Sequence, residues 1–148
     1  MTTPGERIRV ALCDDHESFR HGVAEMLSFA GDVEVVGEAS SHQEAVAVVS
    51  ELKPDVVLLD LEVPGGSMGA HESMGRMLEV SPPPRVVVFS MHDEPGMVRR
   101  FLSRGAVAYL PKSAEMGKLV KAVRDAGKRS RETPGGGDRP VSRGREDG

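Results

Sequence analysis

The sequence predicts an α/β protein whose single five-stranded parallel sheet is covered by helices on both faces. Short apolar segments alternate five times with segments whose apolar residues recur at helical spacing. Short connections and right-handed crossovers then favour a doubly wound sheet. The central strand is the continuous apolar run 56–59, which ends in Asp60 and is followed by the loop residues Pro64, Gly65 and Gly66.

The first half of the chain supplies two further strands and two helices. Alternating residues 8–12, which lead into Cys13, predict the first strand, and residues 33–37 predict a shorter second strand. One apolar stripe predicts a helix that Gly31 ends, and another predicts a helix that ends at Pro54. The two stripes are Phe19, Val23, Met26, Leu27 and Ala30, and Ala45, Val48, Val49 and Leu52.

The second half continues the alternation with less regular helices. A weak stripe predicts the third helix, a short stripe closed by Gly105 predicts the fourth, and Ser113 is a candidate N-cap for the fifth. Residues 85–90 predict the fourth strand, and residues 108–112 the fifth, which Pro111 places at a sheet edge. The three stripes are Met74, Met77 and Leu78; Val98, Phe101 and Leu102; and Met116, Leu119, Val120 and Val123.

The composition predicts one globular domain with short polar additions. The chain has 148 residues, 39% of them hydrophobic and 28% charged. We expect an N-terminal extension at 1–6, a folded domain at 7–127 and a tail at 128–148 that is too polar to order itself. The whole chain has a net charge of −4. From Lys118 onward, nine basic and five acidic residues give a charge of +4, so the first 117 residues have a charge of −8. This acidic balance argues against a nucleic-acid-binding face on the folded part.

The N-terminus and the cysteine content predict a cytoplasmic location. The first residues lack the layout of a signal peptide, and no apolar run approaches the ~20 residues of a membrane span. Cys13 is the only cysteine, which excludes an internal disulfide and a thiolate zinc cluster. We therefore expect no membrane partner, and we expect Cys13 to be a buried apolar residue.

Polar or charged residues stand at the ends of four predicted strands. The first strand ends in Asp14 and Asp15, the third in Asp60, the fourth in Ser90 and the fifth in Lys112. Because the carboxyl ends of parallel strands share one edge of the sheet, these side chains should converge. Three carboxylates repel one another unless a cation neutralises them, and oxygen ligands favour Mg²⁺. With a hydroxyl and an ammonium beside it, a nucleophilic carboxylate there could take up a phosphoryl group.

The order of these segments resembles the receiver domains of two-component response regulators, and among them the NarL-like receivers. The resemblance covers about Arg7 to Ala126 and implies the flavodoxin-like receiver fold. The matching segments are Asp14-Asp15-His16, Val36-Gly37-Glu38-Ala39, 54–61, Met91-His92-Asp93 after Ser90, and Gly105-Ala106 with Tyr109-Leu110 before Lys112.

The resemblance implies a phosphorylation site that depends on magnesium. Asp60 would accept a phosphoryl group from the phosphohistidine of a histidine kinase. Asp15, Asp60 and the backbone carbonyl of Glu62 would bind Mg²⁺ directly, and Asp14 would help through a water molecule.

Three further residues would respond to the phosphoryl group. Ser90 would donate a hydrogen bond to it, Lys112 would pair with one of its oxygens, and Tyr109 would turn inward as the aromatic switch. An unidentified downstream protein would bind the face formed by 98–102, the fifth strand and the last helix. Homodimer formation is left open.

The chain departs from the family pattern at two of these places. Relatives often have proline directly after the lysine, whereas this chain reads Pro111-Lys112-Ser113. The loop after Asp60, residues 64–69, is longer than usual before its closing glycine. Both departures bear on whether the site can be phosphorylated.

Other polar residues near the predicted site have less defined roles. Glu62 brings a further carboxylate close to the phosphoacceptor. We hypothesise that Glu62 and His92 set the lifetime of the phosphorylated state by admitting or repelling water. We expect His16 and His21 to be surface residues.

The sequence shows no helix-turn-helix pattern of the kind that follows the receiver in NarL-like regulators. We therefore expect a stand-alone receiver that acts as a switch, is not an enzyme and does not bind DNA sequence-specifically. One alternative is a phosphorylation-independent interaction adaptor with the same fold. The other is an enzyme on a similar sheet, either an aspartate-nucleophile phosphatase or a flavin carrier.

Overall fold

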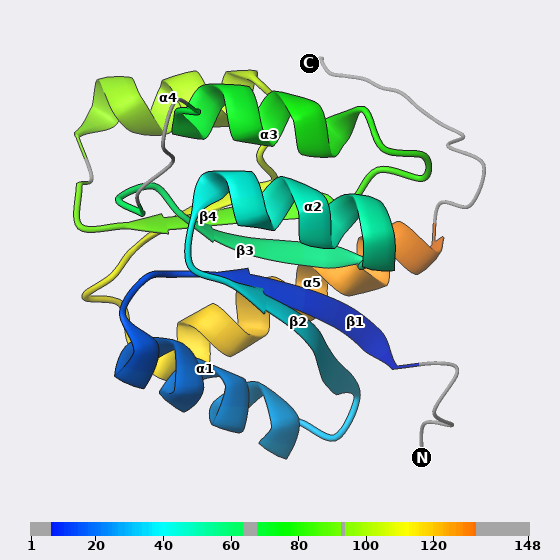
Figure 1. Cartoon of the computed structure of the whole chain (residues 1–148). Coiled ribbons are helices and arrows are strands. Elements are labelled where there is room, and N and C mark those ends of the chain that lie inside the picture. Colours follow the sequence, from blue (N-terminus) through cyan, green and yellow to red (C-terminus); the bar gives the residue numbers. More distant parts are fainter. Residues whose placement is uncertain (1–6, 64–67, 93, 133–148) are drawn as a thin grey trace.

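Strands and helices alternate along the chain, as the sequence predicts. The computed structural model describes residues 7–63, 68–92 and 94–132, with no description of the side chains of 129–132. Figure 1 shows the described elements, which are β1 (Ile8–Cys13), α1 (Glu17–Phe29), β2 (Val33–Ala39), α2 (His42–Leu52), β3 (Val56–Asp60), α3 (Ala70–Leu78), β4 (Arg85–Ser90), α4 (Pro95–Ser103), β5 (Ala108–Pro111) and α5 (Met116–Glu132).

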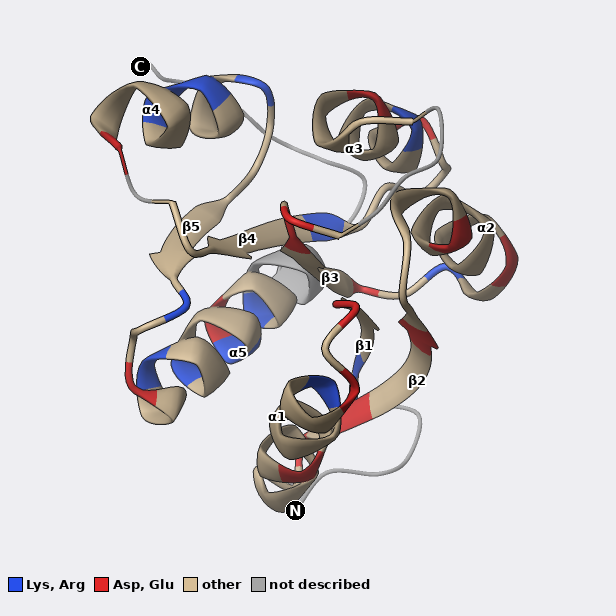
Figure 2. Cartoon of the chain, turned by 60° about the vertical axis from the view of Figure 1, so that its left-hand side comes forward, with Lys and Arg blue, Asp and Glu red and all other residues tan. Residues whose placement is uncertain are grey.

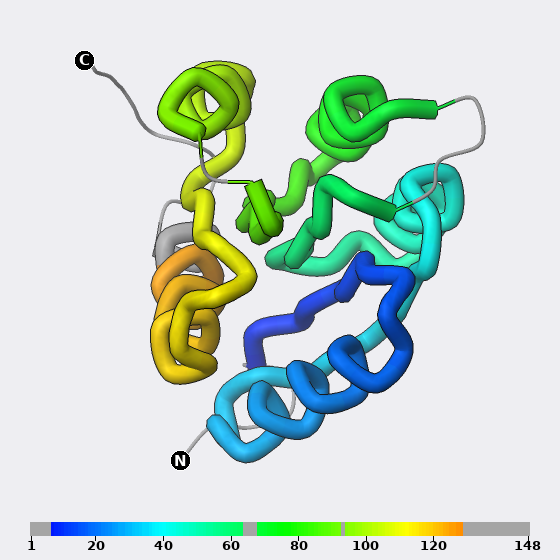
Figure 3. Tube along the Cα trace, turned by 90° about the vertical axis from the view of Figure 1, so that its left-hand side faces the viewer, coloured from blue at the N-terminus to red at the C-terminus, as the bar shows by residue number. Residues whose placement is uncertain are grey.

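The five strands form one parallel sheet in the order β2-β1-β3-β4-β5. Helices α2, α3 and α4 cover one face, and α1 and α5 cover the other (Figure 3). This arrangement confirms the predicted doubly wound sheet, with β3 at its centre and β5 at an edge.

Alternation along β3 divides the core between the two faces. Val57 and Leu59 pack with α2, α3 and α4, whereas Val56 and Leu58 pack with α1 and α5. Successive side chains of a strand point to opposite faces, so a strand covered on both sides must be apolar throughout. The one charged residue of β3 is therefore Asp60, which stands at the carboxyl end of the strand.

Two details of the C-terminal helix differ from the sequence-based expectation. A turn after β5, in which Ala114 N–H donates to the Pro111 carbonyl, contains Ser113, and α5 begins only at Met116. The prediction that Ser113 caps this helix was wrong. Helix α5 also continues to Glu132, past the predicted start of the tail, because no proline or glycine lies between Lys128 and Glu132.

The remainder of the tail, 133–148, and the predicted extension, 1–6, lie outside the described residues. Within the described part, no helix is both long and apolar enough to cross a membrane. Acidic residues lie in the loops after β1 and β3, and basic residues follow one another along α5 (Figure 2). The loops after β1 and β3 thus place acidic groups at the carboxyl edge of the sheet.

Candidate functional site

The carboxyl edge of the sheet brings together the residues that the sequence places at strand ends. Asp14 follows β1, Asp60 and Ser90 end β3 and β4, and Lys112 follows β5. The side chains of Asp14, Asp60 and Ser90 are buried, although each has a polar group. Burial of two carboxylates side by side is costly unless a cation lies close to both.

Lys112 supplies that cation. Its Nζ lies 2.7 Å from Asp60 Oδ2 and 3.2 Å from Asp14 Oδ2, and its side chain is 9% exposed. The ammonium also lies 4.9 Å and 5.2 Å from the ring centroids of Phe19 and Phe89, which is favourable for a cation. The Lys112 N–H donates to the Ser90 carbonyl at 2.8 Å, so the proline before Lys112 does not keep the lysine from the site.

Burial controls the protonation of this ion pair. It raises the pKa of Asp60 from 3.8 to about 6, against the opposing effects of Lys112 and of the Glu62 N–H. Burial alone would lower the pKa of Lys112, but its contacts with Asp60 and Asp14 raise it above the ordinary value. Near neutral pH, therefore, Lys112 is charged and Asp60 is mostly a carboxylate, the form in which it can act as a nucleophile.

Cys13 is buried close to this pair. Burial and the neighbouring carboxylates of Asp60 and Asp14 raise the pKa of its thiol to about 12. Its Sγ lies 3.5 Å from the Ser41 carbonyl. The predicted role as a buried apolar residue agrees with this position.

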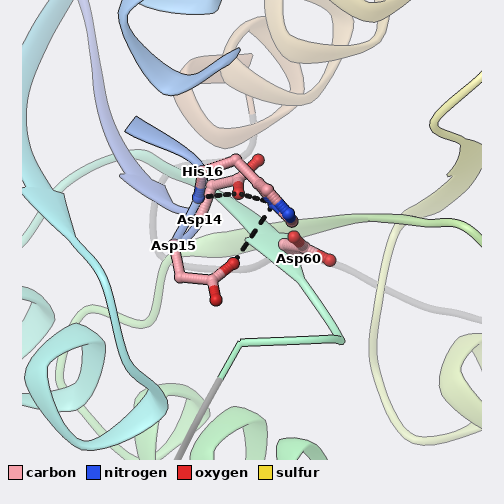
Figure 4. Close-up of side chains that lie close together, drawn as sticks. All are labelled: Asp14, Asp15, His16 and Asp60. Carbon is pink, nitrogen blue, oxygen red and sulfur yellow. Dashed lines mark hydrogen bonds and ion pairs between the residues drawn. The ribbon is translucent and has the colours of Figure 1, made fainter. Parts of the chain in front are cut away.

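Four side chains surround a position suited to a cation. Asp14, Asp15, His16 and Asp60 each offer a ligand atom, and these atoms lie within 4.8 Å of one another (Figure 4). Beyond the ion pairs with Lys112, the Oδ2 atoms of Asp14 and Asp60 are buried without a hydrogen-bond partner. Three carboxylates against one ammonium leave an excess of two negative charges, so the donor set fits a divalent cation.

Glu62 occupies the side of the site next to β4. Its backbone N–H donates to Asp60 Oδ1 at 3.0 Å, and its carboxylate accepts from Ser90 Oγ at 2.5 Å and from the Met91 N–H at 3.0 Å. Burial would raise the pKa of Glu62, but these hydrogen bonds lower it below the ordinary value. The hydroxyl predicted to bind a phosphoryl group is therefore engaged by Glu62, and the predicted role of the Glu62 backbone carbonyl stays a prediction.

Tyr109 is connected to the same side of the site. Its hydroxyl donates to the His92 carbonyl at 2.6 Å, and the His92 N–H donates to Ser90 Oγ at 3.0 Å. The Tyr109 ring is half-buried and lies 6.3 Å from the ring of Phe101, centroid to centroid. A continuous set of hydrogen bonds thus joins Glu62, Ser90, His92 and Tyr109.

Sequence reasoning missed two contacts in the loop after β1, which contains Asp14 and Asp15. Arg20 donates from Nη1 to the Asp14 carbonyl and from Nε to Glu38, both at 2.6 Å, and so ties β1 to β2. His16 is exposed, as expected, but its Nδ1 also lies 3.2 Å from carboxylate oxygens of both Asp14 and Asp15. Arg20 and His16 belong to segments whose sequence patterns are recognisable, but only the structure shows which residues their side chains contact.

Sequence reasoning also missed His42 and Ser73, which lie next to the loop after β3. His42 is buried, with Nδ1 at 3.1 Å from Ser73 Oγ and Nε2 at 3.4 Å from the Leu61 carbonyl. Burial lowers the pKa of His42, so its ring is neutral at physiological pH. The pair joins α2 and α3 to the backbone just after Asp60.

Comparison with known proteins agrees with this geometry. The sequence pattern of the response regulator receiver domain matches residues 10–124. The "Probable transcriptional regulatory protein NarL" of Mycobacterium tuberculosis (strain CDC 1551 / Oshkosh) is 41% identical over 123 residues, which are 83% of this chain and 56% of that protein. The "Nitrate/nitrite response regulator protein NarL" of Escherichia coli (strain K12) is 40% identical over 121 residues, which are 82% of this chain and 55% of that protein.

The fold is also found in solved structures. The signal receiver domain of the Mycobacterium tuberculosis response regulator NarL superimposes with a TM-score of 0.77 at 39% identity, covering 83% of this chain and 98% of that domain. The chain thus spans about half the length of the curated relatives that it matches. Since both the sequence and the fold match over most of its length, this chain belongs to the response regulator receiver domain family.

Proposed function

We propose that this protein is a phosphorylation-dependent switch of a two-component system, in which Asp60 accepts a phosphoryl group from a histidine kinase. The observation that carries the proposal is the buried Asp60 carboxylate, which has the Lys112 ammonium 2.7 Å away and two further carboxylates close by. An acidic cluster of this kind is where receiver domains typically bind Mg²⁺. The relatives' transcriptional activities belong to longer proteins, so the proposal is limited to receiving and passing on the phosphoryl signal.

Each carboxylate has a distinct part in the proposed transfer. Asp15, Asp60 and the Glu62 carbonyl would hold Mg²⁺, and Asp14 would reach it through water. When bound, the ion stabilises negative charge on the oxygens of the transferring group. An oxygen of Asp60 forms the new bond to phosphorus as the bond from phosphorus to the kinase histidine breaks. Lys112, already placed by Asp60, pairs with a phosphoryl oxygen.

The output follows from competition for the Ser90 hydroxyl. A phosphoryl group on Asp60 offers Ser90 a stronger acceptor than the Glu62 carboxylate, so the hydrogen bond from Ser90 to Glu62 would break. Because Ser90, His92 and Tyr109 are hydrogen-bonded in series, the change would reach Tyr109 at the surface formed by α4, β5 and α5. A downstream protein or a second copy of this chain would bind there. This is a two-state equilibrium that modification biases.

We also propose a cytoplasmic location, with which a single buried cysteine is consistent. Phosphorylation with acetyl phosphate and Mg²⁺, followed by intact-mass measurement, tests the function directly. We expect the mass of one added phosphoryl group on the protein and none on Asp60→Asn. An unmodified wild-type protein would instead favour the phosphorylation-independent adaptor.

A further inference from the structure

We infer that His42 is a positioning residue for the phosphoacceptor Asp60, on which it acts through the peptide group between Leu61 and Glu62. The inference rests on the proposed function, because it concerns how the Asp60 carboxylate is held for phosphoryl transfer. His42 is the first residue of α2 and is only 2% exposed, so its ring lies in the interior behind the site.

One peptide group faces His42 on one side and Asp60 on the other. Its carbonyl, which belongs to Leu61, lies 3.4 Å from His42 Nε2. Its N–H, which belongs to Glu62, donates to Asp60 Oδ1 at 3.0 Å. Because a peptide group is planar and rigid, a hydrogen bond that fixes the direction of the carbonyl also fixes the direction of the N–H. Rotation of this peptide group would take the N–H away from Asp60.

The number of available hydrogens decides which His42 nitrogen is protonated. Burial lowers the pKa of His42, so the ring is neutral with one N–H, and the Ser73 hydroxyl supplies one O–H. Three contacts compete for these two hydrogens. His42 Nε2 faces the Leu61 carbonyl, and His42 Nδ1 lies 3.1 Å from Ser73 Oγ. Ser73 Oγ also lies 3.0 Å from the Ala70 carbonyl.

The contact with Ala70 is the one that can be given up. The Ala70 carbonyl belongs to the first turn of α3 and accepts the helical N–H four residues further on. The Ser73 hydroxyl is therefore able to donate to His42 Nδ1, which leaves the ring hydrogen on Nε2 for the Leu61 carbonyl. The opposite tautomer would place the Nε2 lone pair against a carbonyl oxygen in the interior, where an acceptor without a donor is costly. Ser73 thus selects the tautomer with which His42 holds the peptide group.

This peptide group completes the support of the Asp60 carboxylate. Oδ1 accepts from the Glu62 N–H, whereas Oδ2 lies 2.7 Å from Lys112 Nζ. The carboxylate is thereby held at both oxygens before a phosphoryl donor arrives. A nucleophile held in its reactive orientation reacts faster than one that rotates, so loss of the His42 hydrogen bond should slow phosphorylation.

The test uses the full chain and its variants His42→Leu, His42→Gln and Ser41→Ala. Leucine has no hydrogen-bond donor, whereas the side-chain amide of glutamine has the reach of Nε2 and can donate to the Leu61 carbonyl. Ser41→Ala is the control, because the Ser41 hydroxyl caps the same end of α2 by accepting the Glu44 N–H at 3.0 Å. Its removal weakens the start of this helix through a different hydrogen bond.

Amide hydrogen exchange without Mg²⁺ reports on the peptide group itself. We expect His42→Leu to speed exchange of the Glu62 amide at least about tenfold more than that of Leu58, a buried residue of β3, as the loss of one hydrogen bond predicts. His42→Gln should restore this ratio to within about threefold of the wild type. Ser41→Ala should leave the ratio unchanged, and nitrogen-15 shifts of the wild-type ring should place the hydrogen on Nε2.

The rate of phosphorylation by acetyl phosphate with Mg²⁺ measures the consequence for Asp60. We expect His42→Leu to react about tenfold more slowly than the wild type, and His42→Gln and Ser41→Ala to stay within about threefold of it. If His42→Gln behaves like His42→Leu in both measurements, the donor to Leu61 is not what matters, and the inference is wrong.

Three other results would overturn the inference alone when the wild type is phosphorylated normally. If His42→Leu speeds exchange of the Glu62 and Leu58 amides equally, His42 only fills the core. If the Glu62 amide exchanges selectively faster but phosphorylation keeps its rate, the peptide group does not position Asp60. If the ring hydrogen lies on Nδ1, His42 does not hold the Leu61 carbonyl. A wild type that acetyl phosphate leaves unmodified would reject the proposed function and the inference with it.

Discussion

The two sides of the candidate site are stabilised by different interactions. On one side, which we call the ionic half, Asp14, Asp60 and Lys112 are almost completely buried and held by opposite charges at 2.7 Å and 3.2 Å. This half has one ammonium for its two buried carboxylates, and Asp15 adds a third at the surface. It is therefore fixed in position but incompletely neutralised.

On the other side, which we call the relay, Glu62, Ser90, His92 and Tyr109 are joined by hydrogen bonds. Its members are partly exposed except for Ser90, and each hydrogen bond can be exchanged for another at a cost of about 1 kcal/mol. Under the proposed function, the ionic half would carry out the chemistry and the relay would change its hydrogen bonds. Disturbing the ionic half should therefore change stability strongly, whereas disturbing the relay should mainly change kinetics and output.

Removal of the ammonium should have the largest effect. Without Mg²⁺, Lys112→Ala leaves two buried carboxylates without a counter-ion, and we expect the free energy of unfolding to fall by about 3–5 kcal/mol in urea denaturation at pH 7. Lys121→Ala is the control, because Lys121 also pairs with an aspartate, Asp125, but at an exposed position where about 0.5 kcal/mol or less is expected. Equal losses in the two variants would show that the ionic half is not held by charge.

The free energy of unfolding should depend on pH, because Lys112 does not fully offset the cost of burying the Asp60 carboxylate. Burial raises its folded-state pKa from 3.8 to about 6, so the folded protein binds the proton more tightly than the unfolded chain. Stability from this group is complete below about pH 4 and is lost as the pH rises towards 6 and beyond. We expect Asp60→Asn to be more stable than the wild type by about 1–3 kcal/mol at pH 7 without Mg²⁺, and the advantage to shrink towards pH 4.

Urea denaturation of both proteins across this pH range measures the effect. A difference in stability that does not vary with pH would show that the folded state leaves the Asp60 carboxyl group unperturbed. Saturating Mg²⁺ should reduce the advantage of Asp60→Asn, because the ion stabilises only the wild-type carboxylate.

The sequence predicts the ionic half better than it predicts the relay. Strand β3 is apolar until Asp60 and β4 until Ser90, so both the sheet and the convergence of the strand ends could be predicted. The relay could not, because the contact of Glu62 with Ser90 joins residues 28 apart and depends on one side-chain rotamer. The turn of the His16 ring onto the acidic cluster is likewise a matter of rotamer and not of residue pattern.

Changes to Glu62 and His92 should alter kinetics more than stability. The Glu62 carboxylate lies against Ser90 and Met91, and His92 Nε2 is 3.9 Å from it. We expect Glu62→Asn and His92→Ala to shorten the lifetime of phosphorylated protein about fivefold, which corresponds to about 1 kcal/mol in the barrier, because water then reaches the phosphoryl group. Glu94→Ala is the control, since the Glu94 carboxylate lies 3.7 Å from His92 Nδ1, whereas the other ring nitrogen, Nε2, is the one near Glu62. Unchanged lifetimes in both variants would reject this role.

Tyr109→Phe should change the free energy of unfolding least among these variants. It should nevertheless weaken the response of α4 and β5 to phosphorylation. The change removes the hydrogen bond from the hydroxyl to the His92 carbonyl but keeps the ring beside Phe101, so we expect a loss of about 1 kcal/mol or less. Phosphorylation by acetyl phosphate should proceed at the wild-type rate, because the hydroxyl that is removed bonds the His92 carbonyl, whereas Asp60 is paired with Lys112. Amide hydrogen exchange in α4 and β5 should then respond less to phosphorylation than in the wild type. An undiminished response would mean that the signal leaves Ser90 by another route, and the relay would end at His92.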